Sequence, residues 1–168
     1  MESQAFVTRA LLCLALACSG SSTTDRVDHA RPITKPVIKT PFTVEVLGLT
    51  GLAPTDTAPA RKVTMELRTA FLEYATIKTR DTSRDAVDAA IQADCDQRSV
   101  DCLAKIAQIG NVERIVYGSV NGTVVRVKLL VAATRQVLDW ETHALASGDA
   151  AIRATAREAV ASLLSRAP

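Results

Sequence analysis

The chain has 168 residues, of which 48% are hydrophobic and 23% charged, so it is long enough for one folded domain and too apolar for wholesale disorder. Its 20 Lys and Arg residues against 18 Asp and Glu residues give a net charge of +2, which offers no electrostatic case for wrapping nucleic acid. Aromatic residues make up only 4%, so stacking surfaces for bases are sparse. We therefore expect no nucleic-acid partner.

Residues 1–17 are predicted to be a signal peptide. Arg9 precedes a short apolar run that ends in Ala15-Leu16-Ala17, which fits the small-x-small cleavage rule. Leu14-Ala15-Leu16-Ala17-Cys18 also resembles a bacterial lipobox, in which the Cys receives the lipid and becomes the first residue. Three interpretations stay open: a lipoprotein anchored through Cys18, a plain secreted protein that begins at Cys18, and an apolar N-terminal helix of a cytosolic protein. The lipoprotein is preferred, with palmitate among its modifications.

Residues 18–41 are interpreted as the lipidated Cys18 and a Pro-rich tether. A small polar run, Ser19–Thr24, comes directly after Cys18, and Pro32, Pro36 and Pro41 follow among polar residues without apolar periodicity. Pro-rich chain favours extended conformations, so 23 such residues could reach roughly 70 Å. A diacylglyceryl group and an amide-linked chain on Cys18 would together meet the two-signal requirement for stable membrane anchoring.

Two of the four cysteines remain once Cys13 leaves with the signal and Cys18 carries lipid. An exported protein with an even remainder favours a disulfide between Cys95 and Cys102. The bond closes a loop of about eight residues and would contribute roughly 2.5 kcal/mol on the chain-entropy model. Free thiols and a metal site are the alternatives, but the spacing does not suit zinc and no second Cys or His pair completes four ligands. We expect no metal and no cofactor.

Strand and helix patterns alternate through the first part of the domain, which is predicted to span residues 42–168. A strand is predicted over 43–49, a helix with Pro59 in its first turn to about residue 75, and a short strand over 76–79. Ser83 is predicted to cap a second helix, and Ser99 a third that Gly110 ends as a left-handed residue. The positions expected on the apolar faces of these helices are Val63, Leu67, Ala70, Phe71, Tyr74, Ala86, Val87, Ala90, Ile91, Cys102, Leu103, Ile106 and Ile109.

The apolar period changes to two after residue 113. Strands are predicted over 114–120, 123–131 and 137–145, with Asn121-Gly122 as the hairpin turn between the first two. A final helix is predicted over 149–166. The inward positions are expected to be Val125, Val127, Leu129, Val131, Leu138, Trp140 and Ala144 on the strands, and Ile152, Ala156, Val160, Leu163 and Leu164 on the helix. The positions expected to face outward are Arg126, Lys128, Asp139, Glu141 and His143.

A two-residue Asn121-Gly122 turn also predicts a register for the hairpin. Val120 would pair with Thr123, Tyr117 with Arg126, and Val116 with Val127. The face that carries Val116, Val125 and Val127 is predicted to pack on helices, and the face that carries Tyr117 is predicted to be less covered. An exposed Val127 with a buried Arg126 would contradict the strand assignments.

This order of elements predicts an α/β (α+β) fold with a mixed sheet of about four to five strands, ending in an antiparallel three-strand meander, and about four helices packed on it. Three segments carry a resemblance: Val46–Leu49 before a capped helix, Cys102-Leu103-Ala104 in a helix that runs to Gly110, and Arg114–Val120 as the next strand. Over about residues 42–165 the chain resembles the TolB amino-terminal-like domain, a relative of the domain in LpoB-type envelope lipoproteins. The resemblance implies a small interaction module and carries over no site residue.

Three patterns resemble chemical sites but do not meet the requirements of such sites. Gly48-Leu49-Thr50-Gly51 follows a strand and precedes a helix, but it lacks a phosphate-binding motif and Asp56 occupies the place of a phosphate. Ser119 does not have the spacing of a nucleophile elbow. Asp139, Glu141 and His143 alternate on one strand face, where a solvated surface explains them better than a metal or acid–base site.

The sequence therefore predicts no catalytic residue and no enzyme. The preferred function is a regulatory protein-interaction module of a bacterial envelope, in the periplasm, whose partners are another envelope protein and, through the lipid on Cys18, the membrane; the outer membrane is favoured over the inner. One alternative is an oligomerising subunit of a secretion or export assembly, which ring formation in gel filtration would reveal. Another is a small periplasmic ligand-binding protein or hydrolase, which a deep pocket with converging polar groups would reveal.

Overall fold

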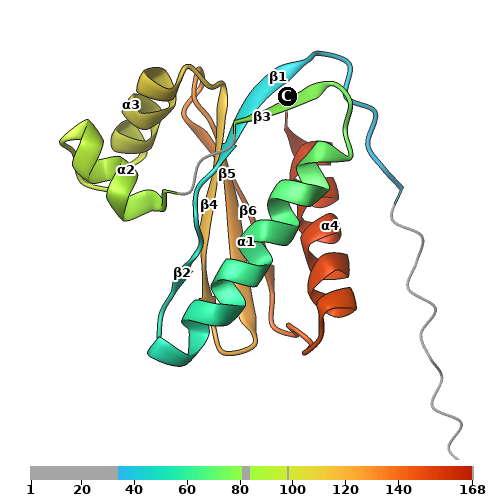
Figure 1. Ribbon diagram of the computed structural model, residues 1–168. Helices are drawn as coiled ribbons and strands as arrows, with labels where there is room; N and C mark the ends of the chain where they lie inside the picture. The colour runs from blue at the N-terminus through green and yellow to red at the C-terminus, as the bar shows by residue number, and fades with distance from the viewer. Residues whose placement is uncertain (1–33, 81–83, 98, 168) are drawn as a thin grey trace, which may run out of the picture. The chain divides into compact units, whose positions relative to one another are not determined.

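The computed structural model describes residues 34–80, 84–97 and 99–167. Within them a mixed sheet carries α-helices on both faces (Figure 1). The strands are β1 (Phe42–Val46), β2 (Thr50–Gly51), β3 (Ile77–Arg80), β4 (Arg114–Asn121), β5 (Val124–Val131) and β6 (Gln136–Thr142). The helices are the 3₁₀ turn η1 (Pro54–Asp56), α1 (Thr57–Leu72), α2 (Ala86–Ala93), α3 (Val100–Gly110) and α4 (Asp149–Arg166). The predicted fold class and the closing meander are confirmed.

The strand order is β3-β1-β4-β5-β6, and the short β2 pairs with β4 alone. β1 is parallel to both of its neighbours, β3 and β4, whereas the pairs β4–β5 and β5–β6 are antiparallel. Parallel strands in the middle of a sheet are covered on both faces, and the strand Phe42–Val46 accordingly has buried residues on both of its faces.

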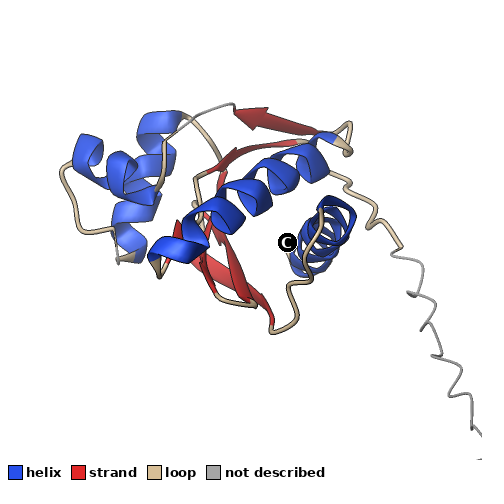
Figure 2. Ribbon diagram, turned by 60° about the horizontal axis from the view of Figure 1, so that its bottom comes forward, coloured by secondary structure: helices blue, strands red, loops and turns tan. Residues whose placement is uncertain are grey.

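Two hydrophobic cores lie on opposite faces of the sheet. α1 and α4 pack side by side on one face, and α2 and α3 cover part of the other (Figure 2). Phe71 and Leu163 are among the largest fully buried side chains of the first core, and Leu103 and Ile115 are among those of the second. The domain therefore has three layers, with a smaller helical layer on the α2–α3 side.

The predicted apolar stripes of α1 and α4 are confirmed, but that of α2 is only half right: Ala90 is buried and Ala86 packs against the second core, as predicted. Val87 and Ile91 are exposed, and the buried positions are Ala89, Ala90 and Ala93. Alanines let the backbone of α2 approach α3 closely, and a hydrophobicity pattern ranks them below the larger side chains. Asp85 caps the helix by accepting from the Asp88 N–H at 2.9 Å; the predicted cap, Ser83, lies outside the described residues.

The predicted cap at the start of α3 is confirmed, but the left-handed residue predicted at its end is wrong. The Ser99 hydroxyl accepts from the Cys102 N–H at 3.0 Å, so the cap is confirmed. The left-handed residue after the helix is Asn111, with φ of 50°, and Gly110 is the last helical residue. Gly110 leaves room for two charged side chains: a Cβ there would lie 2.8 Å from the Arg80 guanidinium and 2.9 Å from the Glu45 carboxylate. Ile109 was expected in the core and is exposed.

The hairpin keeps its predicted faces but shifts its register by two residues. Asn121 pairs with Val124, so the turn consists of Gly122 and Thr123, and Tyr117 faces Lys128 where Arg126 was predicted. Gly122 has φ of 56°, and Asn121 has no positive φ, so this is a turn with glycine at its first central position. A shift of two preserves the alternation, and Val127 is buried while Arg126 is exposed, as predicted.

We expect Gly122→Val to lower the free energy of unfolding by at least ~1 kcal/mol, because a β-branched residue resists positive φ. Nothing lies within 4 Å of a Cβ built at this position, so crowding does not contribute. Urea denaturation measures the loss. The matched variant is Gly122→Asn, which tolerates the left-handed region and should lose much less. Equal stability of the two variants would contradict the positive φ at the turn.

Candidate functional site

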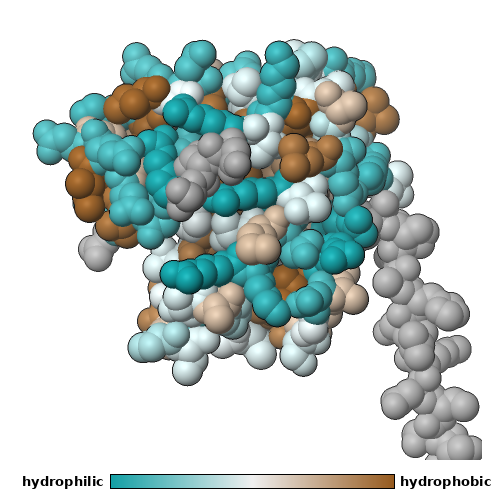
Figure 3. All heavy atoms as spheres, in the orientation of Figure 1, coloured by the Kyte–Doolittle hydropathy of each residue, from teal (hydrophilic) through white to brown (hydrophobic). Residues whose placement is uncertain are grey.

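A groove of about 550 Å³ lies between α1 and α2, with β2 and the two residues before it at its floor. Gly48–Gly51 form the floor, and Met65 on α1 and Val87 on α2 give the two walls apolar side chains. Met65 is 63% exposed although it belongs to a packed helix. In Figure 3, hydrophobic side chains lie scattered among hydrophilic ones over α1 and α2. The groove is thus open, partly apolar and edged by charge.

The positive and the negative side chains of the groove lie on opposite walls. Arg61 and Arg68 stand on the α1 side, and Asp85 and Asp88 on the α2 side. Arg68 donates to the Val46 carbonyl at 3.1 Å, and the Asp85 carboxylate caps α2. Among the described residues, the side chains of Arg61 and Asp88 have no hydrogen-bonding or ionic partner. Within the described parts of the chain, the groove therefore offers an unpaired cation, Arg61, on one wall and an unpaired anion, Asp88, on the other.

At the start of α1, the place that an anion would take is occupied by the Asp56 carboxylate. The buried Asp56 carboxylate accepts from the Ala53 N–H at 3.0 Å and from the Gly122 N–H of the hairpin turn at 3.2 Å. The Leu49 N–H donates to the Thr64 hydroxyl at 2.9 Å. Asp56 therefore already supplies the negative charge at this helix start, as the sequence suggested.

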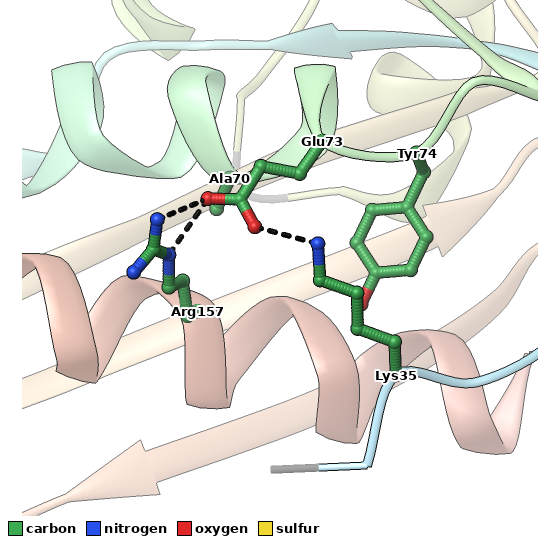
Figure 4. A pocket seen from close by; sticks show the side chains of 5 residues that line it. All are labelled: Lys35, Ala70, Glu73, Tyr74 and Arg157. Atoms are coloured by element: carbon green, nitrogen blue, oxygen red, sulfur yellow. Dashed lines mark hydrogen bonds and ion pairs between the residues drawn. The ribbon is translucent and has the colours of Figure 1, made fainter.

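A second, smaller hollow of about 300 Å³ marks where the segment before β1 meets the helices (Figure 4). One Glu73 carboxylate oxygen lies 2.9 Å from the Lys35 ammonium, and the other lies 2.7 Å from Nε of Arg157 on α4. Lys35 also lies 5.7 Å from the centre of the Tyr74 ring. The hydrogen bond from Lys35 and the charge of Arg157 hold the pKa of Glu73 below its usual value. We call these residues, Lys35, Glu73, Tyr74 and Arg157, the tether clamp.

We expect Glu73→Gln to free the segment 34–41 from the domain, because the ion pairs to Lys35 and Arg157 are lost. Limited trypsin digestion should then cut after Lys39 several-fold faster than in the unaltered protein. Glu66→Gln is the matched control, since Glu66 pairs with Arg153 across the same two helices, away from Lys35. Equal rates in the two variants would contradict the clamp.

The clamp also has an expected pH dependence. Because the folded-state pKa of Glu73 is lowered, its stabilising contribution is present above the ordinary carboxyl pKa and is lost as the pH falls through the folded value. The difference in backbone hydrogen exchange of residues 34–41 between Glu73→Gln and the unaltered protein should therefore vanish in acid.

A buried ion pair fixes the start of α2 to the sheet. Glu45 on β1 is fully buried, and its carboxylate accepts from Nε of Arg84 at 2.7 Å and from Nη2 at 3.0 Å. Arg84 also donates to the Gln92 side chain at 2.7 Å, and Arg80 donates to the Gly110 carbonyl. The Arg84–Glu45 ion pair is bidentate and largely buried, so it holds the start of α2 against the sheet. We call it the buried ion pair.

The predicted cysteine sites fall into two groups. Cys18 lies outside the described residues. Cys95 and Cys102 form a disulfide in the structure, with their Cα atoms 5.4 Å apart, and it joins the segment after α2 to the first turn of α3. Cys102 is buried among the residues of the second core. The bond thus ties together the two helices of the smaller layer.

The acidic and imidazole side chains of β6 form a surface ladder. Arg126 on β5 contacts Glu141 and lies 3.8 Å from Asp139, and His143 lies 2.9 Å from Glu141. His143 is well exposed, and β6 ends at Thr142, so the strand is shorter than predicted and Ala144 is exposed where an inward position was expected. Within the parts that the structure describes, no group of three or more His, Cys, Asp or Glu residues is placed to hold a metal.

Sequence reasoning missed the groove and the clamp. Met65 stands on the face of α1 opposite its buried stripe, and a large apolar residue at that position was a detectable signal of the groove. The clamp joins Lys35 to residues far along the chain, and no local pattern indicates such a contact. Over residues 34–80, 84–97 and 99–167, none of the helices is long and apolar enough to cross a membrane.

The described residues thus define a small three-layer α+β domain with an open groove along the start of α1. No family model and no curated protein sequence matches this chain. Solved structures do. The LpoB C-terminal domain from Salmonella enterica is 12% identical, with a TM-score of 0.45, over 64% of this chain and 85% of that one.

Two further solved structures have a comparable likeness. TolB from Acinetobacter baumannii is 14% identical, with a TM-score of 0.49, over 80% of this chain and 31% of that one. The PelC dodecamer from Paraburkholderia phytofirmans is 14% identical, with a TM-score of 0.40, over 79% of this chain and 91% of that one. The resemblance to LpoB-type and TolB-like domains is confirmed as a resemblance, at low sequence identity.

Proposed function

We propose that this chain is a lipid-anchored protein-interaction module of a bacterial envelope, regulatory and non-catalytic, held in the periplasm by a lipid on Cys18. The observation that carries the proposal is the order of features at the start of the chain: the lipobox-like Leu14-Ala15-Leu16-Ala17-Cys18, a small polar run, and a Pro-rich segment that leads into a folded domain. An anchor and a spacer serve a domain that must act close to a membrane. We propose the outer membrane as its location.

The disulfide supports an exported protein. Disulfides persist in the periplasm and are rare in the cytosol, and Cys95 and Cys102 are joined in the structure. The tether clamp supports a spacer with a defined end. Lys35 contacts the domain directly, so the part of the tether between Cys18 and Lys35 could span at most roughly 55 Å.

The surface of the domain supports a binding role. The two hollows described above are open and edged by charges, and the acidic residues of β6 are paired with Arg126. We assign no catalytic residue, and the proposed partner is another envelope protein.

We expect Cys18→Ser to move the protein from the detergent-extracted membrane fraction to the soluble fraction, because the anchoring sulfur is lost. The unaltered protein should incorporate radiolabelled palmitate, and the variant should not. Cys13→Ser is the matched control, since it removes a thiol from the predicted signal peptide and should leave partitioning and labelling unchanged. Membrane partitioning that survives Cys18→Ser would contradict the lipid anchor.

A further inference from the structure

In the described part of the chain, β2 has no strand beside it on the side away from β4. β3 runs next to β1 from the pair Phe42–Ile77 to the pair Glu45–Arg80, and one further bridge joins Gly48 to Asp85. Beyond that bridge, the described structure pairs β2 with β4 on one side only. The position that would continue the line of β3 past β2 is the groove between α1 and α2.

The free edge of β2 presents backbone groups to this groove. The Leu52 N–H donates to the Val120 carbonyl at 2.9 Å, so Leu52 faces β4. Because backbone groups alternate along a strand, the Gly51 N–H and carbonyl point away from β4. An unpaired edge of this kind is a template for another strand.

The walls specify what such a strand would carry. α1 and α2 belong to opposite faces of the sheet, so a strand in the groove would direct alternate side chains to each helix. The side chains facing α1 would meet Arg61 and Met65, and those facing α2 would meet Val87 and Asp88. Charge complementarity therefore favours a carboxylate and an aliphatic residue on one side and a cation and an aliphatic residue on the other.

Arg61 differs from the other charged side chains of α1. α1 has three other charged side chains, and each has a partner: Lys62 pairs with Asp149, Glu66 with Arg153, and Arg68 with the Val46 carbonyl. Within residues 34–80, 84–97 and 99–167 no partner is found for Arg61, the fourth charged side chain of α1, and it lies beside the most exposed apolar side chain of the groove, Met65. A cation next to an exposed apolar residue is complementary to a partner segment that carries both an acidic and an apolar side chain.

We propose that the groove binds an extended segment of a partner protein as an added strand beside β2, with an acidic side chain against Arg61, a basic side chain against Asp88 and aliphatic side chains between Met65 and Val87. This inference rests on the proposed interaction function and names the surface and the chemistry of the partner segment.

The test uses the full-length chain purified in detergent and a fluorescent peptide, Thr-Val-Glu-Val-Val-Lys-Val-Thr, whose alternation matches the two walls. Fluorescence anisotropy should show saturable binding with a dissociation constant of about 1 mM or tighter. Met65→Glu and Arg61→Glu should each weaken it by about tenfold, the size of one significant interface contact. A peptide with Lys in place of Glu should regain affinity for Arg61→Glu. Leu72→Glu is the matched control, because Leu72 is 66% exposed on the same helix outside the groove, and it should leave binding unchanged.

Hydrogen exchange distinguishes strand addition from side-chain contact alone. The Gly51 amide should become protected when the peptide is bound, and an unprotected Gly51 would overturn the added strand. Absence of saturable binding, or equal binding by the Met65→Glu and Leu72→Glu variants, would overturn the proposal. Self-association of the free chain that Met65→Glu abolishes, without peptide binding, would assign the groove to a second copy. Each of these results leaves membrane partitioning of the Cys18→Ser variant as a separate test of the anchor.

Discussion

Arg84→Met should lower the free energy of unfolding by about 3–5 kcal/mol, the largest effect that we expect from a single charged residue. Glu45 is fully buried on β1, and Arg84 supplies a two-pronged ion pair to its carboxylate. Methionine fills much of the same volume but leaves the carboxylate without that partner in a low-dielectric site. Urea denaturation followed by circular dichroism measures the loss.

A second variant separates the charge from the packing. Replacing both partners, Glu45→Leu with Arg84→Met, should recover most of the stability, because no uncompensated charge then remains buried. A loss of less than about 1 kcal/mol for Arg84→Met would show that other groups satisfy the Glu45 carboxylate. That result would contradict the stabilising role of the buried ion pair.

Gly118→Ala should destabilise the sheet by about 3 kcal/mol or more, beyond the usual cost of overpacking a core. A Cβ on Gly118 would lie directly against the Arg126 carbonyl oxygen and 3.2 Å from the Val127 Cα on β5. Both obstacles are backbone atoms, so β4 and β5 would have to part at their centre to make room. Thermal unfolding measures the change.

Ser119→Ala is the matched control for that substitution. Ser119 is the next residue of β4, and its side chain lies on the opposite face of the sheet, so its loss should stay within about 0.5 kcal/mol. If the two alanine variants had equal midpoints, β4 and β5 would not approach each other as closely as described.

The elements that the sequence predicted well are those whose signal is local and repeated. α4 was placed at residues 149–166, and its stripe from Ile152 to Leu164 is buried, because five apolar residues at helical spacing allow one orientation. The buried valines of β5 follow from strict alternation in the same way. A shift of two in the hairpin did not disturb these faces.

The features that the sequence did not predict depend on contacts between distant residues. The turn of the hairpin uses Gly122 and Thr123 where Asn121-Gly122 was expected, and the Gly122 N–H donates to Asp56, 66 residues earlier. Glu45 alternates with Val44 and Val46, so a pattern alone places it on a solvent face. Its burial follows from the α2–α3 layer, whose alanines were underrated, and its partner Arg84 is 39 residues away.

The features of the candidate site also differ in whether a local sequence signal indicates them. The cysteines and the lipobox-like segment are sequence motifs and could be read directly. The groove is made by three elements that meet only in the fold, and its charged walls, Arg61 and Asp88, carry no motif.

The most direct test of the central proposal is mass spectrometry of the N-terminal peptide of the protein purified from the membranes of the bacterium that produces it. We predict a mature chain that begins at Cys18, with a diacylglyceryl group on its sulfur and a fatty acyl chain on its amino group. A chain that still begins at Met1, or a mature Cys18 without lipid, would contradict the anchored module.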